Sequence, residues 1–271
     1  MSKFERKSPR IVAELLEEIS SGRRQPGEQF LTVAQLSEKY DVSLNTASGI
    51  IKQLKTLGAL SGRSGGKTWV RVPPRTTHRR NTRYHQEKAD VHTVEAERAQ
   101  RGVSEYDTGV SVRSLHEVDA RFDIVDPPED IASLLRLSAP AKVLRRSYSR
   151  RHAEGAGISG STSYLPYELA ARNPDLLDAT REPWPGGTMH QLWTIGVEIG
   201  EIEDHVTVDM PTAQEAADYD IPPGVPIVRL RKISYDIDGA PVEVSDITLP
   251  GDRVELVYNT PLKRWPSNAN D

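Results

Sequence analysis

The sequence predicts an α+β fold, in which a small helical head precedes an antiparallel-sheet body. Apolar residues recur at helical spacing over residues 8–58, and a glycine-rich segment follows directly. From about residue 103 the pattern changes to the alternation typical of strands. The 271 residues suffice for two domains. We expect a head at 1–74, a linker at 75–102, a body at 103–262 and a tail at 263–271.

The composition excludes several kinds of site. The chain contains no cysteine, which rules out disulfides, thiol catalysis and cysteine metal ligands and suits a reducing cytoplasm. The polar N-terminus MSKFERKSPR predicts no secretion signal. No apolar run approaches the roughly 20 residues of a membrane span. No motif predicts a cofactor or a metal ion.

Charge is distributed unevenly along the chain. Residues 1–83 contain 16 Lys and Arg against 7 Asp and Glu, a net charge of +9. The remaining residues contain 19 against 32, a net charge of −13. A basic head on an acidic body indicates that the head meets a polyanion, which would repel the body.

The head should contain three helices. Ser8-Pro9 is typical of a helix start and Gly22 of a helix end. Thr32 and Gln35 fit the capping box of a second helix, and Ser43 fits the cap of a third. The expected buried faces are Ile11, Val12, Leu15, Leu16 and Ile19; Val33, Leu36 and Tyr40; and Ala47, Ile50 or Ile51, Leu54 and Leu57.

The second and third helices are joined by the tight turn Asp41-Val42-Ser43, which is the pattern of a helix-turn-helix. In this motif the N-terminal residues of the second helix enter the major groove of DNA. Asparagine can bond adenine there, and hydroxyls can bond bases or phosphates. The residues offered are Ser43, Leu44, Asn45, Thr46 and Ser48.

The stretch SGRSGGKTWVRV at 61–72 has two interpretations. Gly66-Lys67-Thr68 resembles the end of a nucleotide-binding P-loop, which would indicate an ATPase. However, Ser61 stands where the first P-loop glycine belongs, and a strand rather than a helix follows. We favour a β-hairpin wing, in which glycines permit a tight turn and Arg63 and Lys67 face DNA. A solvated hairpin with incidental charge is the alternative.

Residues 26–70 resemble the winged helix-turn-helix head of GntR-type bacterial transcription regulators. The Pro-Gly turn, the capped second helix, Val42-Ser43 and the glycine-rich wing carry the resemblance. The family's Pro-Ser-Glu-Arg run is here Leu-Thr-Val-Ala at 31–34. Its Ser-Arg-x-Thr-x-x-Arg run is here Ser-Leu-Asn-Thr-Ala-Ser at 43–48. Because the arginines of both runs are absent, a different sequence preference is expected.

Candidate DNA contacts lie on both helices and on the wing. We expect Asn45, Thr46 and Ser48 to read the sequence. The full set is Thr32, Ser43, Asn45, Thr46, Ser48, Lys52, Arg63, Gly65, Gly66 and Lys67.

Residues 73–102 contain few large apolar residues, so we expect a linker that forms no core. Its clustered arginines either contact DNA phosphates or only keep a tether in solution; they are Arg75, Arg79, Arg80 and Arg83. Three histidines recur every seven residues, a spacing that does not suit a metal site.

The body should be an antiparallel sheet with a few short helices. Strands are predicted at 141–152, 157–166, 204–211 and, as a hairpin, 224–250. The hairpin turn is Asp236-Ile237-Asp238-Gly239. Thr212 and Glu215 fit a further capping box, and another helix is placed near 188–195.

Residues 104–260 resemble the UTRA domain of the HutC subfamily of GntR regulators, which has a chorismate-lyase-like fold. The resemblance is strongest at 210–258. Pro-Thr-x-x-Glu-Ala, Pro-x-Gly-x-Pro and Tyr-Asp-x-Asp-Gly-x-Pro-Val-Glu stand there in order. The resemblance is closest to versions common in high-GC actinobacteria, with which the Arg- and Ala-rich composition agrees.

The resemblance implies a small-molecule effector site in a cleft of the sheet domain. Its residues carry over as Arg146, Tyr148, Ser161, Ser163, Tyr164, Thr188, His190 and Glu243. Arg146 suits a phosphate or carboxylate, and Glu243 suits a sugar hydroxyl, an amine or Arg146 itself. Since Arg145 and Arg146 are adjacent on a strand, only one can enter the cleft. Tyr148 replaces a frequent second arginine, which leaves room for a less charged or aromatic ligand.

Together these features predict a ligand-responsive transcriptional regulator, with repression favoured. A homodimer would place two heads on a pseudo-palindromic DNA operator. Constitutive repression without a ligand is a variant of this hypothesis. The alternative is an enzyme that uses the lyase-like body, with His190 and Glu243 as acid and base. A fold alone does not confer chemistry, and no nucleophile or metal constellation supports this alternative.

Overall fold

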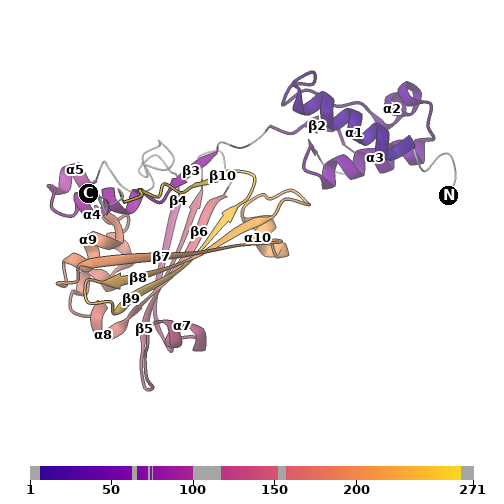
Figure 1. Ribbon diagram of the computed structural model, residues 1–271. Coiled ribbons are helices and arrows are strands. Elements are labelled where there is room, and N and C mark those ends of the chain that lie inside the picture. The colour runs from indigo at the N-terminus through magenta and orange to yellow at the C-terminus, as the bar shows by residue number, and fades with distance from the viewer. Residues whose placement is uncertain are drawn as a thin grey trace, which may run out of the picture.

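The computed structural model describes residues 7–62, 66–72, 74, 76–99, 117–151 and 157–263. Figure 1 shows a helical head at the N-terminal end and a larger body built on one sheet. The α+β architecture predicted from the sequence is confirmed. Among the described residues, no helix is long and apolar enough to cross a membrane.

The head consists of three helices and a two-stranded wing. The helices are α1 (Lys7–Ser20), α2 (Val33–Tyr40) and α3 (Leu44–Thr56), and the strands are β1 (Leu60–Ser61) and β2 (Trp69–Val70). Leu15, Leu36 and Leu54 are fully buried where the helices meet, as their spacing predicts. Leu57 was expected in this core but is 53% exposed, because α3 ends one residue before it.

The wing depends on one glycine. Gly62 has φ +125°, and a Cβ there would overlap the carbonyl oxygen of Lys67 on the returning strand. Only glycine tolerates this geometry. Thr68 leads into the antiparallel strand β2 rather than a helix, so the P-loop interpretation of this stretch is wrong.

The segment expected to be a tether is folded over much of its length. It forms β3 (Thr77–Arg80), α4 (Arg83–Asp90) and α5 (Glu95–Arg98). β3 pairs in parallel with β10 (Val254–Val257), and Val91 is buried in a core of the body. The expectation that 75–102 forms no core is therefore wrong for these residues, because the partners that bury them lie far away in the sequence.

The body is a six-stranded antiparallel sheet of order β4-β5-β6-β9-β8-β7. The strands are β4 (Glu117–Val125), β5 (Val143–Arg151), β6 (Gly157–Pro166), β7 (Ile199–Asp209), β8 (Ile227–Asp236) and β9 (Pro241–Pro250). The predicted β8–β9 turn is confirmed: Gly239 has φ +80°, and the Asp236 carboxylate accepts from the Ala240 N–H at 2.8 Å.

Short helices cover both faces of the sheet. On one face, α8 (Tyr167–Ala170), α9 (Gly187–Trp193) and the α4 segment pack over Leu144 and Leu165. On the other face, α7 (Glu129–Leu134) packs over Val143 and Val244, and α10 (Ala213–Asp218) lies beside Ile227. Two 3₁₀ turns, Pro174–Leu177 and Ala179–Arg181, precede α9. The predicted helix near 188–195 corresponds to α9.

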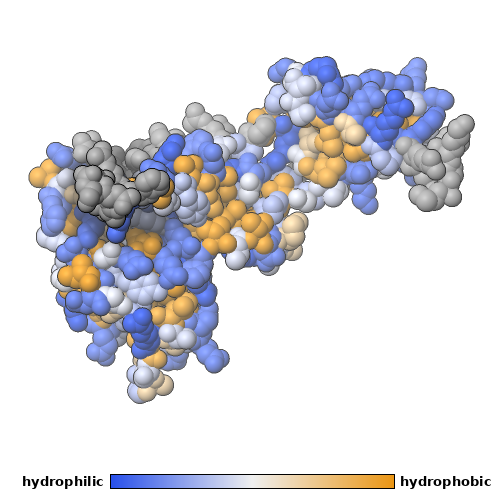
Figure 2. Space-filling model, in the orientation of Figure 1, coloured by the Kyte–Doolittle hydropathy of each residue, from blue (hydrophilic) through white to orange (hydrophobic). Residues whose placement is uncertain are grey.

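The body also carries apolar surface. β7 is an edge strand, and its end exposes Val206, Val208 and Met210. Figure 2 shows apolar residues gathered on this part of the body, beside a mostly hydrophilic surface.

Candidate functional site

The exposed face of α3 presents polar groups at its N-terminal end. Asn45, Ser48 and Lys52 are exposed, whereas Ala47 and Ile50 on the opposite side are fully buried. Helical spacing produces this division, since residues four apart share a face. The N-terminus of α3 is therefore open for contact with another molecule.

Two of the predicted DNA contacts, Ser43 and Thr46, bond to each other at the start of α3. The Ser43 hydroxyl accepts from the Thr46 N–H at 3.1 Å and shares a 2.9 Å hydrogen bond with the Thr46 hydroxyl. These contacts cap the helix. Asn45 and Ser48 have no side-chain hydrogen bond within the part of the chain that the structure describes. They are the polar side chains of this helix end with the most capacity left for a partner.

Thr32 caps α2 in the same manner. Its hydroxyl accepts from the Gln35 N–H at 3.3 Å, and the Gln35 side chain accepts from the Thr32 N–H at 2.9 Å. This reciprocal arrangement is the capping box expected from the sequence. It assigns Thr32 a structural role that is compatible with, but does not require, contact with DNA.

The wing lies beside α3. Lys55 holds it there, because its ammonium donates to the Gly62 carbonyl at 3.1 Å. Gly66 and Lys67 are exposed on the returning arm. The predicted contacts Arg63 and Gly65 lie outside the described residues.

A second polar site lies inside the body, around Arg146. Its side chain is 1% exposed and donates three hydrogen bonds: to Ser163 at 3.0 Å, Gln191 at 2.6 Å and Glu243 at 2.8 Å. Strands β5, β6 and β9 and helix α9 each supply one of these groups. Arg145, its neighbour on β5, points to the opposite face and pairs with Asp123 at 3.0 Å. The prediction that only one of the two arginines can enter the site is confirmed.

Glu243 is shared between two cations. Besides Arg146, it accepts from Lys232 at 2.8 Å and from Ser234 at 3.3 Å. Burial alone would raise the pKa of Glu243, but Lys232 and Arg146 outweigh burial and hold this pKa below its ordinary value. Lys232 and Ser234 were not predicted as members of this site. They are two residues apart on β8, the strand paired with that of Glu243, so the alternation of strand residues could have placed them on the same face.

The network continues through Glu182 to α9. One Glu182 oxygen accepts from Tyr148 and from Gln191, each at 3.0 Å, and the other accepts from the Trp184 N–H at 2.9 Å. The Trp184 indole donates to His190 at 2.9 Å. Burial raises the pKa of Tyr148 and lowers that of His190, so both side chains are neutral near pH 7.

Helix α4 adds a third carboxylate. Glu87 accepts from the Met189 N–H of α9 at 3.1 Å, and burial raises the pKa of Glu87. Nearby, the Tyr84 hydroxyl accepts from Arg79 at 2.8 Å and donates to Asp204 at 2.9 Å. Sequence reasoning missed both residues because it treated their segment as a tether.

The remaining predicted effector residues do not all reach this cluster. Ser161 lies half-buried on β6, on the same face as Ser163, and Thr188 is half-buried at the start of α9. Tyr164 packs with Ile131 on the opposite face of the sheet. It therefore lies away from the cluster around Arg146, because consecutive strand residues face opposite sides.

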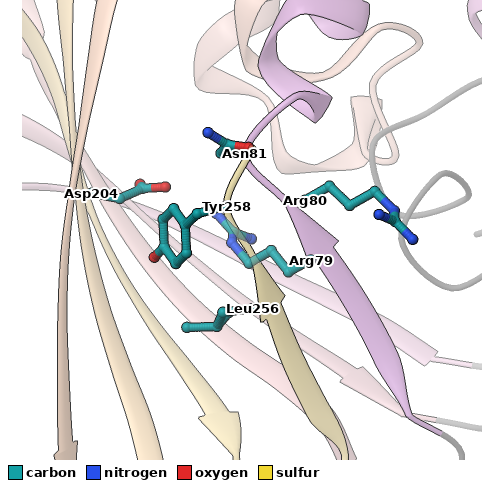
Figure 3. Close-up of a pocket in the computed structure, with 6 residues that line it drawn as sticks. All are labelled: Arg79, Arg80, Asn81, Asp204, Leu256 and Tyr258. Atoms are coloured by element: carbon teal, nitrogen blue, oxygen red, sulfur yellow. The ribbon is translucent and has the colours of Figure 1, made fainter. Parts of the chain in front are cut away.

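A small hollow lies at the edge of the body, where β3 and β10 approach β7 (Figure 3). It is lined by Arg79, Arg80, Asn81, Asp204, Leu256 and Tyr258. Arg79 reaches across towards Asp204 and Tyr258, whereas Arg80 points away from them. Within the described residues, no group of three or more His, Cys, Asp or Glu is arranged to hold a metal ion.

Comparison with known proteins agrees with this architecture. The family model described as "UTRA domain" matches residues 117–255. An uncharacterized HTH-type transcriptional regulator of Streptomyces coelicolor is 26% identical over 256 residues, covering 90% of this chain and 88% of that protein.

Two solved structures resemble the chain along most of its length. A GntR-family transcriptional regulator superposes with a TM-score of 0.64 at 22% identity, covering 95% of this chain and 98% of that chain. PhnF from Mycobacterium smegmatis gives a TM-score of 0.49 at 20% identity, covering 93% and 99%. At this identity the likeness to the first structure concerns the fold.

Proposed function

This chain belongs to the UTRA domain family, and we propose that it is a DNA-binding transcriptional regulator controlled by a small molecule. We place it in the HutC subfamily of GntR regulators, as an actinobacterial type that acts in the cytoplasm. It would repress transcription by occupying an operator. One observation carries the proposal: a single chain joins a winged head with an open recognition helix to a sheet body with a buried, charged cluster.

The head supplies what an operator requires. Asn45 and Ser48 have hydrogen-bonding groups that the described chain leaves unused, and the exposed Lys52 and Lys67 provide positive charge on α3 and on the wing. Asparagine and serine read base edges, while lysines neutralise phosphates. The Streptomyces coelicolor relative supports this assignment and the actinobacterial type.

The body supplies an effector site whose contacts are already satisfied internally. Arg146 and Lys232 both form ion pairs with Glu243, so an effector must replace some of these contacts. A small polar molecule with at least one hydrogen-bond acceptor for Arg146 fits this requirement. It can change DNA binding only by binding one conformation of the protein more tightly than the other.

Glu243 and His190, the acid and base of the alternative enzyme hypothesis, are poorly suited to proton transfer. A general base works best with a pKa near the working pH. The pKa of Glu243 is instead lowered, and His190 already accepts the Trp184 N–H. The arrangement favours binding of a ligand over its chemical conversion.

We propose a homodimer formed by the body. The edge strand β7, with Val208 66% exposed at its end, supports self-association, because unpaired edges and apolar patches mark interaction surfaces. Analytical ultracentrifugation of the full chain measures the oligomeric state directly, and a monomer at micromolar concentration would contradict this part of the proposal.

Fluorescence anisotropy tests the function. Labelled DNA from the region upstream of the protein's own gene is compared with scrambled DNA over a salt series. We expect tight binding to the upstream DNA alone, weakening steeply with salt. Lys52→Ala should reduce the salt slope by about one unit, as expected for loss of one phosphate contact. Lys142→Ala, on the body, is the matched control and should change nothing. Equal, salt-insensitive binding to both DNAs would contradict the proposal.

A further inference from the structure

Two residues of the recognition helix α3 make no contact within the described chain that accounts for their residue type. Leu44, its first residue, is 60% exposed, although it is a large apolar side chain. Gly49 lies in the middle of the helix and is also exposed. Its backbone is helical, and a Cβ added to it would meet no atom within 4 Å. Alanine would fit there and would stabilise the helix.

Both residues lie on the face that carries Asn45, Ser48 and Lys52. Leu44, Ser48 and Lys52 follow one another at intervals of four, so they form a single stripe along the helix. Gly49 leaves a flat place beside the middle of this stripe. The stripe thus begins with the apolar Leu44, has the small polar Ser48 at its centre and ends with the cationic Lys52.

We propose that this stripe reads an operator half-site containing thymine, with Leu44 against the thymine methyl group and the DNA in close approach at Gly49. This inference rests on the proposed function and specifies the chemistry of its DNA partner. In the major groove, the methyl group of thymine is the apolar feature of the base edges, and apolar side chains recognise it. Asn45, one residue further on, can bond an adenine at a neighbouring position.

Gly49 allows the helix backbone to approach the DNA more closely than any side chain would. Glycine serves this purpose wherever a backbone must come near a ligand. In an exposed helix interior it also weakens the helix, and within the described chain no contact at Gly49 offsets that loss. A close partner outside the chain accounts for a glycine at this position.

The thymine contact is tested by removing single methyl groups from the DNA. Operator sites are first selected from random duplex DNA with the full-length protein, and each thymine is then replaced singly by deoxyuridine. Loss of one buried methyl corresponds to an affinity loss of about 4-fold. We expect such a loss at one position in each half-site for the wild type. Leu44→Ala should bind more weakly and show no further loss at that position.

Leu57→Ala is the matched control for this variant. Leu57 is a leucine that directly follows the other end of the same helix and is similarly exposed, at 53%. It should retain both the affinity and the deoxyuridine sensitivity of the wild type. If Leu44→Ala keeps the deoxyuridine sensitivity, or if no thymine methyl matters to the wild type, the thymine contact is overturned.

Gly49→Ala tests the close approach, with two readouts of opposite sign. We expect its unfolding midpoint to rise by about 4 °C, as for a stabilised helix in a small domain. Its affinity for the selected operator should fall at least 10-fold. Unchanged affinity in a stabilised variant overturns the close approach.

If the wild type selects no sequence at all, the proposed function fails and the thymine contact fails with it, whereas selection without methyl sensitivity overturns the thymine contact alone.

Discussion

Arg146 organises the interior of the body as a single residue. A buried guanidinium is tolerated only when its donors are matched, and here they reach a serine, an amide and a carboxylate. Removing the guanidinium would leave Glu243 buried with Lys232 as its remaining ion-pair partner. The geometry also assigns different roles to neighbouring arginines, since Arg145 lies half-exposed on the other face.

Arg146→Ala should therefore be strongly destabilising. We expect a loss of about 3–5 kcal/mol in the free energy of unfolding, the range for breaking a buried ion pair. Arg145→Ala is the matched control and should cost less than about 1 kcal/mol, as for an exposed pair. Urea unfolding at pH 7 measures both. Equal losses of unfolding free energy in the two variants would show that the buried network around Arg146 does not stabilise the body.

Helix α10 illustrates stabilisation at the scale of one element. Its capping box joins Thr212 to Glu215, and Arg229 of β8 binds the same carboxylate at 2.8 Å and 3.1 Å. The hydrogen bond from Arg229 exceeds the opposing effect of burial and, with Thr212, lowers the pKa of Glu215 to about 2. One carboxylate thus both caps α10 and ties it to the sheet.

This pKa predicts acid sensitivity with a definite sign. A carboxylate whose pKa is lowered by folding contributes stability above its unfolded pKa and loses it as the pH falls through the folded value. The contribution of Glu215 is therefore complete above about pH 4.5 and lost towards pH 2. Glu215→Gln keeps the capping box but not the charge, so its deficit in unfolding free energy should shrink between pH 5 and pH 2. Glu168→Gln, exposed on α8, should follow the wild type. A constant deficit for Glu215→Gln would contradict the prediction.

Head and body are connected at the scale of the whole molecule. Arg71, just after the wing, forms an ion pair with Asp252, in the turn before β10. β10 in turn pairs with β3, the first strand after the head. Glu243 of the cluster around Arg146 lies on β9, which leads through Asp252 into β10, so this cluster is linked to the head along the chain and through the ion pair.

Arg71→Ala should loosen this connection. We expect a larger radius of gyration and a broader distribution of head–body distances in small-angle X-ray scattering, because the head then loses this ion pair and keeps its chain connection and the contacts of Thr56 and Gly58 with residues 224–225. Lys67→Ala, on the exposed wing arm, removes a charge from the same part of the head and should leave the scattering unchanged. An unchanged profile for Arg71→Ala would show that the ion pair does not position the head.

Local signals along the chain determined the head and the outline of the body. Thr32 and Thr212 each stand three residues before an amide or carboxylate partner, and Gly62 stands where a turn needs positive φ. These features act over a few residues, so the sequence alone reveals the capped helices, the wing and the β8–β9 hairpin.

Only the tertiary structure decided which groups meet. The burial of Val91 and the pairing of β3 depend on strands that follow far later in the chain, so composition wrongly indicated a tether. Glu87 and Lys232 join the cluster around Arg146 because folding brings α4 and β8 to one face of the sheet. Tyr164 lies on the other face of the sheet from that cluster, because consecutive strand residues alternate between faces. A set of residues implied by a family resemblance does not record which face each residue takes. Caps and turns are short-range, whereas strand order and the contents of a buried site depend on long-range contacts.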